Sequence, residues 1–172
     1  MSNTGGRELR PAAATAVAVS RKLLLTLVAI GAFGAVSSCG VTTKVRSAFG
    51  GELPFRVTVA PDANENSAIA VDVLVVYDAK VLDQLMKLRA AEWFARKQQF
   101  LNDYSEEVSV RGWEWIPSQV VEEQSIAYRS GARKVVLFAD YHTEGDHRAS
   151  VDPQQSFHLV LGPLDMALEV AQ

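Results

Sequence analysis

The feature that most constrains this chain is an uncharged apolar run near its start that ends in its only cysteine. Basic residues stop at Arg21-Lys22, residues 23–36 carry no charge, and Val36-Ser37-Ser38-Cys39 follows. The run is shorter than the roughly 20 apolar residues that span a bilayer. The order of a basic, an apolar and a small-residue segment is typical of a secretion signal. The sequence therefore predicts that residues 1–38 are a lipoprotein signal peptide.

Cys39 also limits how the exported part can be stabilised, because a lone cysteine forms no intramolecular disulfide. An odd cysteine in an exported chain needs a reason. Here the stretch 36–39 resembles the bacterial lipobox, which implies that Cys39 becomes the N-terminus and carries a diacylglycerol thioether and an N-acyl group such as palmitate. Two or more acyl chains hold a protein stably in a bilayer. Gly40 resembles an outer-membrane sorting residue. An uncleaved anchor helix, or an ordinary signal peptide with a chance cysteine, is the alternative.

Charge and missing motifs exclude several function classes. From residue 39 onward, 13 basic residues stand against 19 acidic ones, a net charge of −6. Nucleic-acid binding needs clustered positive charge and is disfavoured. The sequence has no glycine-rich phosphate loop and no serine in a nucleophile-elbow pattern. It therefore predicts neither an enzyme nor a cofactor.

After the signal, residues 39–52 are expected to form the lipidated N-terminus and a flexible tether, and residues 53–172 a periplasmic domain. Phe55, Val57 and Val59 alternate with polar residues, which predicts a half-buried strand. Next comes a turn-rich segment over 61–67. A long strand is predicted over 69–77, with the later half of its second face also buried.

Residues 79–104 change period and composition, which predicts a helical insertion broken near Leu88-Arg89. Its apolar face, with Trp93, is expected to be core. In the following strand, Val108 and Val110 occupy one parity and Trp113 and Trp115 the other. A phase change at Arg111-Gly112 predicts a β-bulge there. The tryptophans could also line a ligand groove, although three large aromatics in a small domain usually fill its core.

The rest of the chain is read as short strands separated by turns. A polar alternating stretch near 120–128 indicates an edge strand, and residues 134–141 a strongly apolar strand. Residues 157–160 and 166–170 form two more strand-sized segments, divided by Gly162-Pro163. This pattern predicts a mainly β protein, an antiparallel β-sandwich with the helical insertion around residues 79–104.

One segment concentrates potential ligands: Asp140-Tyr141-His142-Thr143-Glu144-Gly145-Asp146-His147. On an extended strand Asp140 and His142 project to one side, and Glu144, Asp146 or His147 could return from the loop to complete a zinc-like site. The spacing matches no metal motif, so no metal site is predicted. A small-ligand or metal site here stays an alternative. His158 alternates with apolar neighbours and is expected on an exposed face.

The layout as a whole resembles one family. A lipobox, a short tether, the strand Arg56-Val57-Thr58-Val59-Ala60, an Asp/Asn-rich loop and the strand over 70–78 resemble TssJ, the outer-membrane lipoprotein of the type VI secretion system. The similarity continues through the helical stretch with Trp93-Phe94 and the strand over 135–141. It covers nearly all of residues 39–172.

This resemblance implies a transthyretin-like β-sandwich that is lipid-anchored at the periplasmic face of the outer membrane. It implies binding to the periplasmic C-terminal region of the inner-membrane protein TssM, in a complex that also contains TssL, without catalysis. In the family the contact is attributed to the loop between the first two strands. The partner-binding residues expected here are Asp62, Asn64, Glu65 and Asn66. The alternative function is a periplasmic small-ligand or metal-binding lipoprotein that uses the Asp140–His147 segment.

Overall fold

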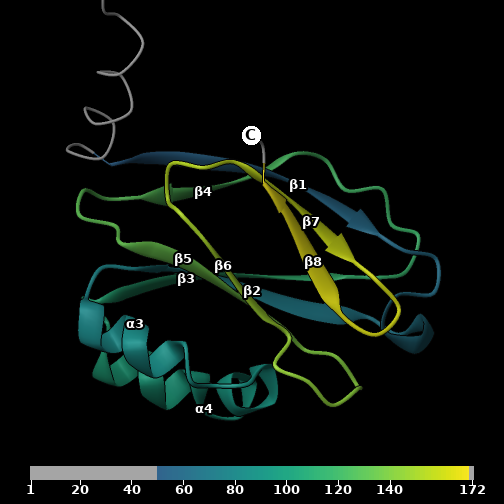
Figure 1. Cartoon of the computed structure of the whole chain (residues 1–172), viewed down its shortest axis with the longest axis horizontal. Coiled ribbons are helices and arrows are strands. Elements are labelled where there is room, and N and C mark those ends of the chain that lie inside the picture. The colour runs from purple at the N-terminus through teal and green to yellow at the C-terminus, as the bar shows by residue number, and fades with distance from the viewer. Residues whose placement is uncertain (1–49, 171–172) are drawn as a thin grey trace, which may run out of the picture. The chain divides into compact units, whose positions relative to one another are not determined.

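The computed structural model describes residues 50–170, in which eight strands form two sheets and two helices cover one of them (Figure 1). The predicted signal, Cys39 and most of the tether lie outside the described residues. One sheet has the order β4-β1-β7-β8 and the other β3-β2-β5-β6. The strands and helices are β1 (Gly51–Val59), β2 (Ile69–Val76), α3 (Ala79–Leu85), α4 (Ala90–Asp103), β3 (Val108–Trp115), β4 (Gln124–Tyr128), β5 (Lys134–Ala139), β6 (Arg148–Val151), β7 (Phe157–Leu161) and β8 (Met166–Val170). The mainly β sandwich with a helical insertion is confirmed.

One strand pair departs from the antiparallel expectation. β1 pairs with β7 in parallel, with Phe55 opposite Phe157 and Val59 opposite Leu161, whereas every other pair in the two sheets is antiparallel. Between β1 and β7 the chain builds the four strands of the other sheet and adds β4 beside β1, and it returns through the loop after β6 in the same direction as β1. Parallel pairing needs such a long connection.

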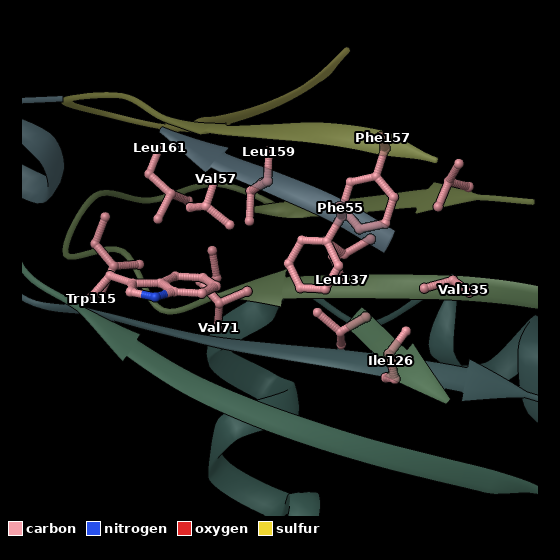
Figure 2. Packing of buried hydrophobic residues seen from close by; sticks show 14 of the residues in the cluster. Phe55, Val57, Val71, Trp115, Ile126, Val135, Leu137, Phe157, Leu159 and Leu161 are labelled. Atoms are coloured by element: carbon pink, nitrogen blue, oxygen red, sulfur yellow. The ribbon is translucent and has the colours of Figure 1, made fainter. Parts of the chain in front are cut away.

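The main core lies between the two sheets. Inward residues of β1 and β7 meet inward residues of β2 and β5, as Figure 2 shows. Phe55 stacks on Phe157 with 4.9 Å between ring centroids, and its ring meets Trp113 edge-on at 5.4 Å. Burying one such side chain contributes about 1.5–3 kcal/mol relative to leaving it exposed. The alternation predicted for residues 55–59 is confirmed.

A second core lies between the β3-β2-β5-β6 sheet and the helices. Leu74 and Val76 point to this side of β2, and Trp93 of α4 stacks on Phe138 at 5.4 Å. The helices lie on the outer face of that sheet, below it in Figure 1. The two-sided burial predicted for the later half of β2 and the helical break near residue 88 are therefore confirmed.

The predicted β-bulge at Arg111-Gly112 is wrong. β3 pairs with β2 in continuous register, from Val108 opposite Val76 to Trp115 opposite Ile69, without an extra residue. The phase changes because β3 passes from one covering layer to another. Val108 packs under the helices, whereas Trp115 packs in the main core.

The first strand begins two residues before residue 53, the predicted start of the domain. Gly51 and Glu52 already belong to β1 and pair with Tyr128 and Ala127 of β4. At Gly51 a Cβ would lie 3.0 Å from the Tyr128 hydroxyl, so a larger residue there would push the tyrosine ring aside by a few tenths of an ångström. Within residues 50–170, neither helix has the length and apolar character needed to cross a membrane.

Candidate functional site

Four connecting segments gather at one end of the sandwich. β1 enters at Gly51 and leaves at Val59, so the segments that follow Val59 lie at the end opposite to the entry point. In Figure 1 three of them lie at the right-hand end, where β1, β3 and β7 finish, and the loop after β5 hangs below them toward the centre. We call this set the loop end; it comprises residues 60–68, 116–119, 140–147 and 162–165.

Backbone hydrogen bonds tie the segment between β1 and β2 to its neighbours. The N–H of Asn64 donates to the carbonyl of Gly162 and that of Glu65 to the carbonyl of Pro163, each over 3.3 Å. On the other side, the Ser118 N–H donates to the Ala60 carbonyl over 3.3 Å. The segment after β1 is therefore held from both sides by distant parts of the chain.

A left-handed turn forms the centre of this segment. Asn64, Glu65 and Asn66 have φ values of 46°, 55° and 63° within the short 3-10 turn Ala63–Asn66. For an L-residue this conformation costs about 1–2 kcal/mol, and asparagine tolerates it better than other residues with a Cβ. The Ser67 N–H closes the turn on the Asn64 carbonyl at 3.0 Å. Glu65 carries the least compensated strain.

Backbone strain is confined to this end. Ser118 at φ 61° and His147 at φ 40° complete the non-glycine residues of 50–170 that have positive φ, and both lie in the loop end. Such conformations persist only where surrounding structure fixes them, and they cluster at functional sites. The strain marks the loop end as the candidate site.

The Asn64 side chain links segment 60–68 to segment 140–147 by hydrogen bonds. It is only 1% exposed. Its Nδ2 donates to the Ala68 carbonyl over 2.9 Å, and its Oδ1 accepts from the His142 N–H over 2.8 Å. Both ends of the amide are therefore satisfied inside the protein.

A second set of hydrogen bonds joins the β5–β6 loop to the β7–β8 turn. The buried His147 ring places Nδ1 2.8 Å from Asp165 Oδ1 and Nε2 2.9 Å from the Thr143 carbonyl. It stacks on Tyr141, whose hydroxyl donates to the Gly162 carbonyl over 3.2 Å. Burial first, and the Asp165 charge second, raise the pKa of Tyr141 far above its ordinary value, so the phenol stays protonated and keeps donating.

No protein-family model and no curated protein matches this sequence. Solved structures do match. The type VI secretion system (T6SS) lipoprotein TssJ1 from Pseudomonas aeruginosa aligns with 72% of this chain and 98% of its own, at 13% identity and a TM-score of 0.54. Serratia marcescens Lip, a membrane bound component of the same type of system, aligns with 72% of this chain and 97% of its own, at 15% identity and a TM-score of 0.52.

The chain has a TssJ-like fold. A structure of the T6SS protein TssM C-terminal domain from EAEC also matches, over 70% of this chain and 98% of that one, at 11% identity and a TM-score of 0.50. At these identities the shared feature is the fold.

Within this TssJ-like fold, the predicted partner-binding residues divide into two groups. Asp62, Glu65 and Asn66 are exposed at the tip of the loop end and are free to touch another protein. Asn64 is buried and hydrogen-bonded at both ends of its amide, so its side chain faces the interior of the loop end and not its surface. The predicted lipidation residue, Cys39, lies outside the described residues.

The Asp140–His147 segment does not assemble the alternative metal site. Both nitrogens of the buried His147 ring are engaged by Asp165 and Thr143, so this ring is occupied inside the protein. Within the part of the chain that the structure describes, no three His, Cys, Asp or Glu side chains are grouped to hold a metal ion. The segment instead braces the loop end.

A hydroxyl, an imidazole and a carboxylate do line up on the outer face of the β4-β1-β7-β8 sheet. Thr58 Oγ1 lies 2.8 Å from His158 Nε2, and His158 Nδ1 lies 3.0 Å from Glu169 Oε2. This order resembles a hydrolytic triad. However, β1 and β7 are interior strands whose N–H groups serve the sheet ladder, which leaves them unable to stabilise an oxyanion. The set is a cross-strand network, and His158 lies on the exposed face as predicted.

Sequence reasoning missed the residues that brace and complete the loop end. Tyr141 and His147 bond across to Gly162 and Asp165 and so join two segments, and Leu164 is exposed at the tip of the β7–β8 turn. The turn itself was signalled by Gly162-Pro163. Its contact with a loop 100 residues earlier in the chain has no local signal.

Proposed function

We propose that this chain is a lipid-anchored structural component of a type VI secretion membrane complex. In this proposal residues 1–38 direct export, Cys39 is acylated, and the domain lies at the periplasmic face of the outer membrane. The loop end binds the periplasmic C-terminal region of a TssM-like inner-membrane protein, in a complex that also holds TssL. The observation that carries the proposal is the TssJ-like fold. The alignments cover 98% of the TssJ1 chain and 97% of the Lip chain.

The direction of β1 supports anchoring at one end of the domain and partner binding at the other. The chain enters the sandwich at Gly51, next to the tether, and the loop end lies beyond Val59. A nine-residue strand spans roughly 30 Å. Eleven residues from 40 to 50 could add at most roughly 40 Å when fully extended. Acyl chains at Cys39 would hold the entry end, which leaves the loop end free to meet a partner across the periplasm.

The anchoring half is tested by replacing Cys39 with serine. Wild-type protein should incorporate labelled palmitate, fractionate with the outer membrane and support secretion. Cys39→Ser should incorporate no label, leave the outer-membrane fraction and abolish secretion. Ser38→Ala is the matched control, because it keeps a small residue before the cysteine. An unmodified thiol at Cys39 in native protein would refute the anchoring half.

The binding half is tested with the purified periplasmic domain of a TssM-like protein from the same organism. The full chain in detergent should retain that domain on a column. Asp62→Trp places a bulky group at the tip of the loop end and should weaken retention without lowering the thermal midpoint. Ala127→Trp, on an exposed position at the entry end, is the control and should leave retention unchanged. Failure of wild-type protein to bind would contradict the proposed function.

A further inference from the structure

The loop end presents exposed apolar side chains on a rigid frame. Leu164 is 58% exposed and Ile116 is 60% exposed. They lie on opposite sides of the segment after β1. On one side Glu65 bonds to Pro163, the residue before Leu164, and on the other Ala60 bonds to Ser118, two residues after Ile116. A single exposed apolar residue needs no explanation. These two, however, border the strained turn at 64–66, which the backbone marks as a candidate site.

Leu164 is held in place by its neighbours. Its carbonyl accepts from Thr143 Oγ1 over 2.8 Å, and the next residue, Asp165, binds His147 and its own chain at Met166 N–H, each over 2.8 Å. A turn fixed on both sides loses little conformational entropy when a partner covers it. Leu164 is therefore a preorganised anchor at the tip of the turn.

The charge around these two residues has one sign. The loop end contains no lysine and no arginine among its residues. It holds six acidic residues: Asp62, Glu65, Asp140, Glu144, Asp146 and Asp165. Arg148, just outside it, contacts Asp146 over 3.4 Å and also donates to the Leu88 carbonyl of the helical layer. The six carboxylates thus leave a strongly negative field around the apolar pair.

This arrangement differs from an ion-binding site or a membrane-binding surface. In residues 50–170 the acidic side chains do not converge in any group of three suited to a cation. An anionic lipid surface would be repelled by the same carboxylates. A spread of like charge around an apolar residue is the pattern of a protein interface, in which charge sets approach and orientation and a buried anchor supplies affinity.

The geometry points to a docking partner whose surface is lined with lysine and arginine around an apolar socket, and the socket receives Leu164. This inference rests on the proposed function, since it specifies the face of the TssM-like periplasmic domain that meets the loop end. The carboxylates accelerate association with that basic face. Leu164 fills the socket and slows dissociation, with Ile116 covering the opposite rim.

The test measures association and dissociation rates of the partner's periplasmic domain on the immobilised full chain, at low and at high salt. Leu164→Ser should raise the Kd about 30-fold, the size of an interface hot spot, mainly through faster dissociation. Met86→Ser is the matched control, because Met86 is a 38% exposed residue of the helical layer. It should leave both rates unchanged.

A charge-neutral variant tests the second half of the inference. Asp62→Asn, Glu65→Gln and Glu144→Gln combined should slow association about tenfold at low salt and flatten its salt dependence. Asp146 and Asp165 are left intact because they bond to Arg148 and His147. The matched control removes three charges away from the loop end: Glu52→Gln, Glu106→Gln and Glu107→Gln.

The outcomes separate this inference from the proposed function. Binding that occurs with wild-type protein, but ignores both Leu164→Ser and the charge-neutral variant, would overturn the inference and leave the proposed function standing. An increase in affinity on neutralising the carboxylates would overturn it as well, because it would mean an acidic partner face. Absence of any binding by wild-type protein would overturn the proposed function itself.

Discussion

A single glycine on β3 makes room for a buried carboxylate. A Cβ at Gly112 would lie 2.6 Å from Asp72 Oδ1. Asp72 is only 4% exposed, and its Oδ2 accepts from Trp93 Nε1 over 2.8 Å and from Lys97 Nζ over 3.0 Å. Because these two donors fix the carboxylate, it cannot turn aside to admit a methyl group. The glycine that suggested a bulge in the sequence is thus required by a side chain on the neighbouring strand.

We therefore predict that Gly112→Ala lowers the free energy of unfolding by about 1–3 kcal/mol, the usual range for overpacking. Urea denaturation of the domain would measure it. The same change made in an Asp72→Ala background should have a much smaller effect, since the opposing oxygen is gone. Equal effects in both backgrounds would mean that the carboxylate is not what excludes the methyl group.

Glu65 is the strained residue of the left-handed turn, and it is exposed. Glycine adopts its φ of 55° without a Cβ penalty but loses more backbone entropy on folding. We predict that Glu65→Gly raises the free energy of unfolding by roughly 0.5–1 kcal/mol and weakens partner binding. Asp62→Gly, at φ −111°, is the control and should lower stability. A less stable Glu65→Gly protein would show that the turn holds no relievable strain.

The sequence indicated that the loop over 61–67 matters, but it could not separate its residues. Asn64 and Asn66 have the same side chain and the same turn propensity, yet one is buried and the other exposed. The difference arises from Ala68 and from His142, which is 78 residues away. Local propensity carries no information on such a partner, so the roles became visible only in the fold.

Among the elements, helix α3 shows how a cap fixes a boundary. Asp78 Oδ1 accepts from the N–H of Lys80 over 2.8 Å and of Val81 over 3.0 Å. The Val81 hydrogen bond, the largest cause, lowers the pKa of Asp78 below its ordinary 3.8. At a pH between the folded pKa and the unfolded pKa of 3.8, Asp78 is protonated in the unfolded state and ionised in the folded state. The cap therefore stabilises the fold fully above pH 3.8 and loses this effect as the pH falls through the lowered pKa of the folded state.

Thermal unfolding of wild type and Asp78→Ala tests this. Wild type should have the higher midpoint at pH 7, and the gap should close as pH falls below 3.8. Asp78→Asn keeps an N-cap acceptor without a titrating charge, so its own gap from Asp78→Ala should stay constant with pH. A wild-type advantage that persists in strong acid would contradict the role assigned to the carboxylate.

The sequence predicted those elements whose covering layers stay the same along their whole length. β1 and the two helices each bury one regular set of side chains, so alternation or helical spacing indicated them directly, and the unbroken apolar run of β2 indicated a strand buried on both faces. β3 misled because it is covered by two layers in succession, and a change of layer produces the same phase shift as a bulge. The parallel β1–β7 pair joins residues about 100 positions apart, and neither strand signals its partner.

For the whole molecule, the sandwich class followed from strand count and turn spacing, whereas the candidate site did not. The residues that build the loop end come from four separate segments. Their convergence depends on the strand order, which places the ends of β1, β3 and β7 together. The negative charge of the domain was readable from the sequence, but its concentration at one end needed the topology.

The two cores share one sheet, and this determines how the domain unfolds. β2 sends Val71 and Val73 into the main core and Leu74 and Val76 into the core under the helices. Neither layer can lose its packing without disturbing a strand that the other needs. We therefore predict a single cooperative transition for the domain, in spite of its helical insertion.

Tryptophans placed in both cores allow this to be tested. Trp93→Phe leaves Trp113 and Trp115 to report on the main core, and Trp113→Phe with Trp115→Phe leaves Trp93 to report on the second. In each variant the fluorescence midpoint in urea should coincide with the midpoint from far-ultraviolet circular dichroism. If the Trp93 signal changed at a lower urea concentration than the circular dichroism, the helices would unfold first, and the shared strand would not couple the two layers.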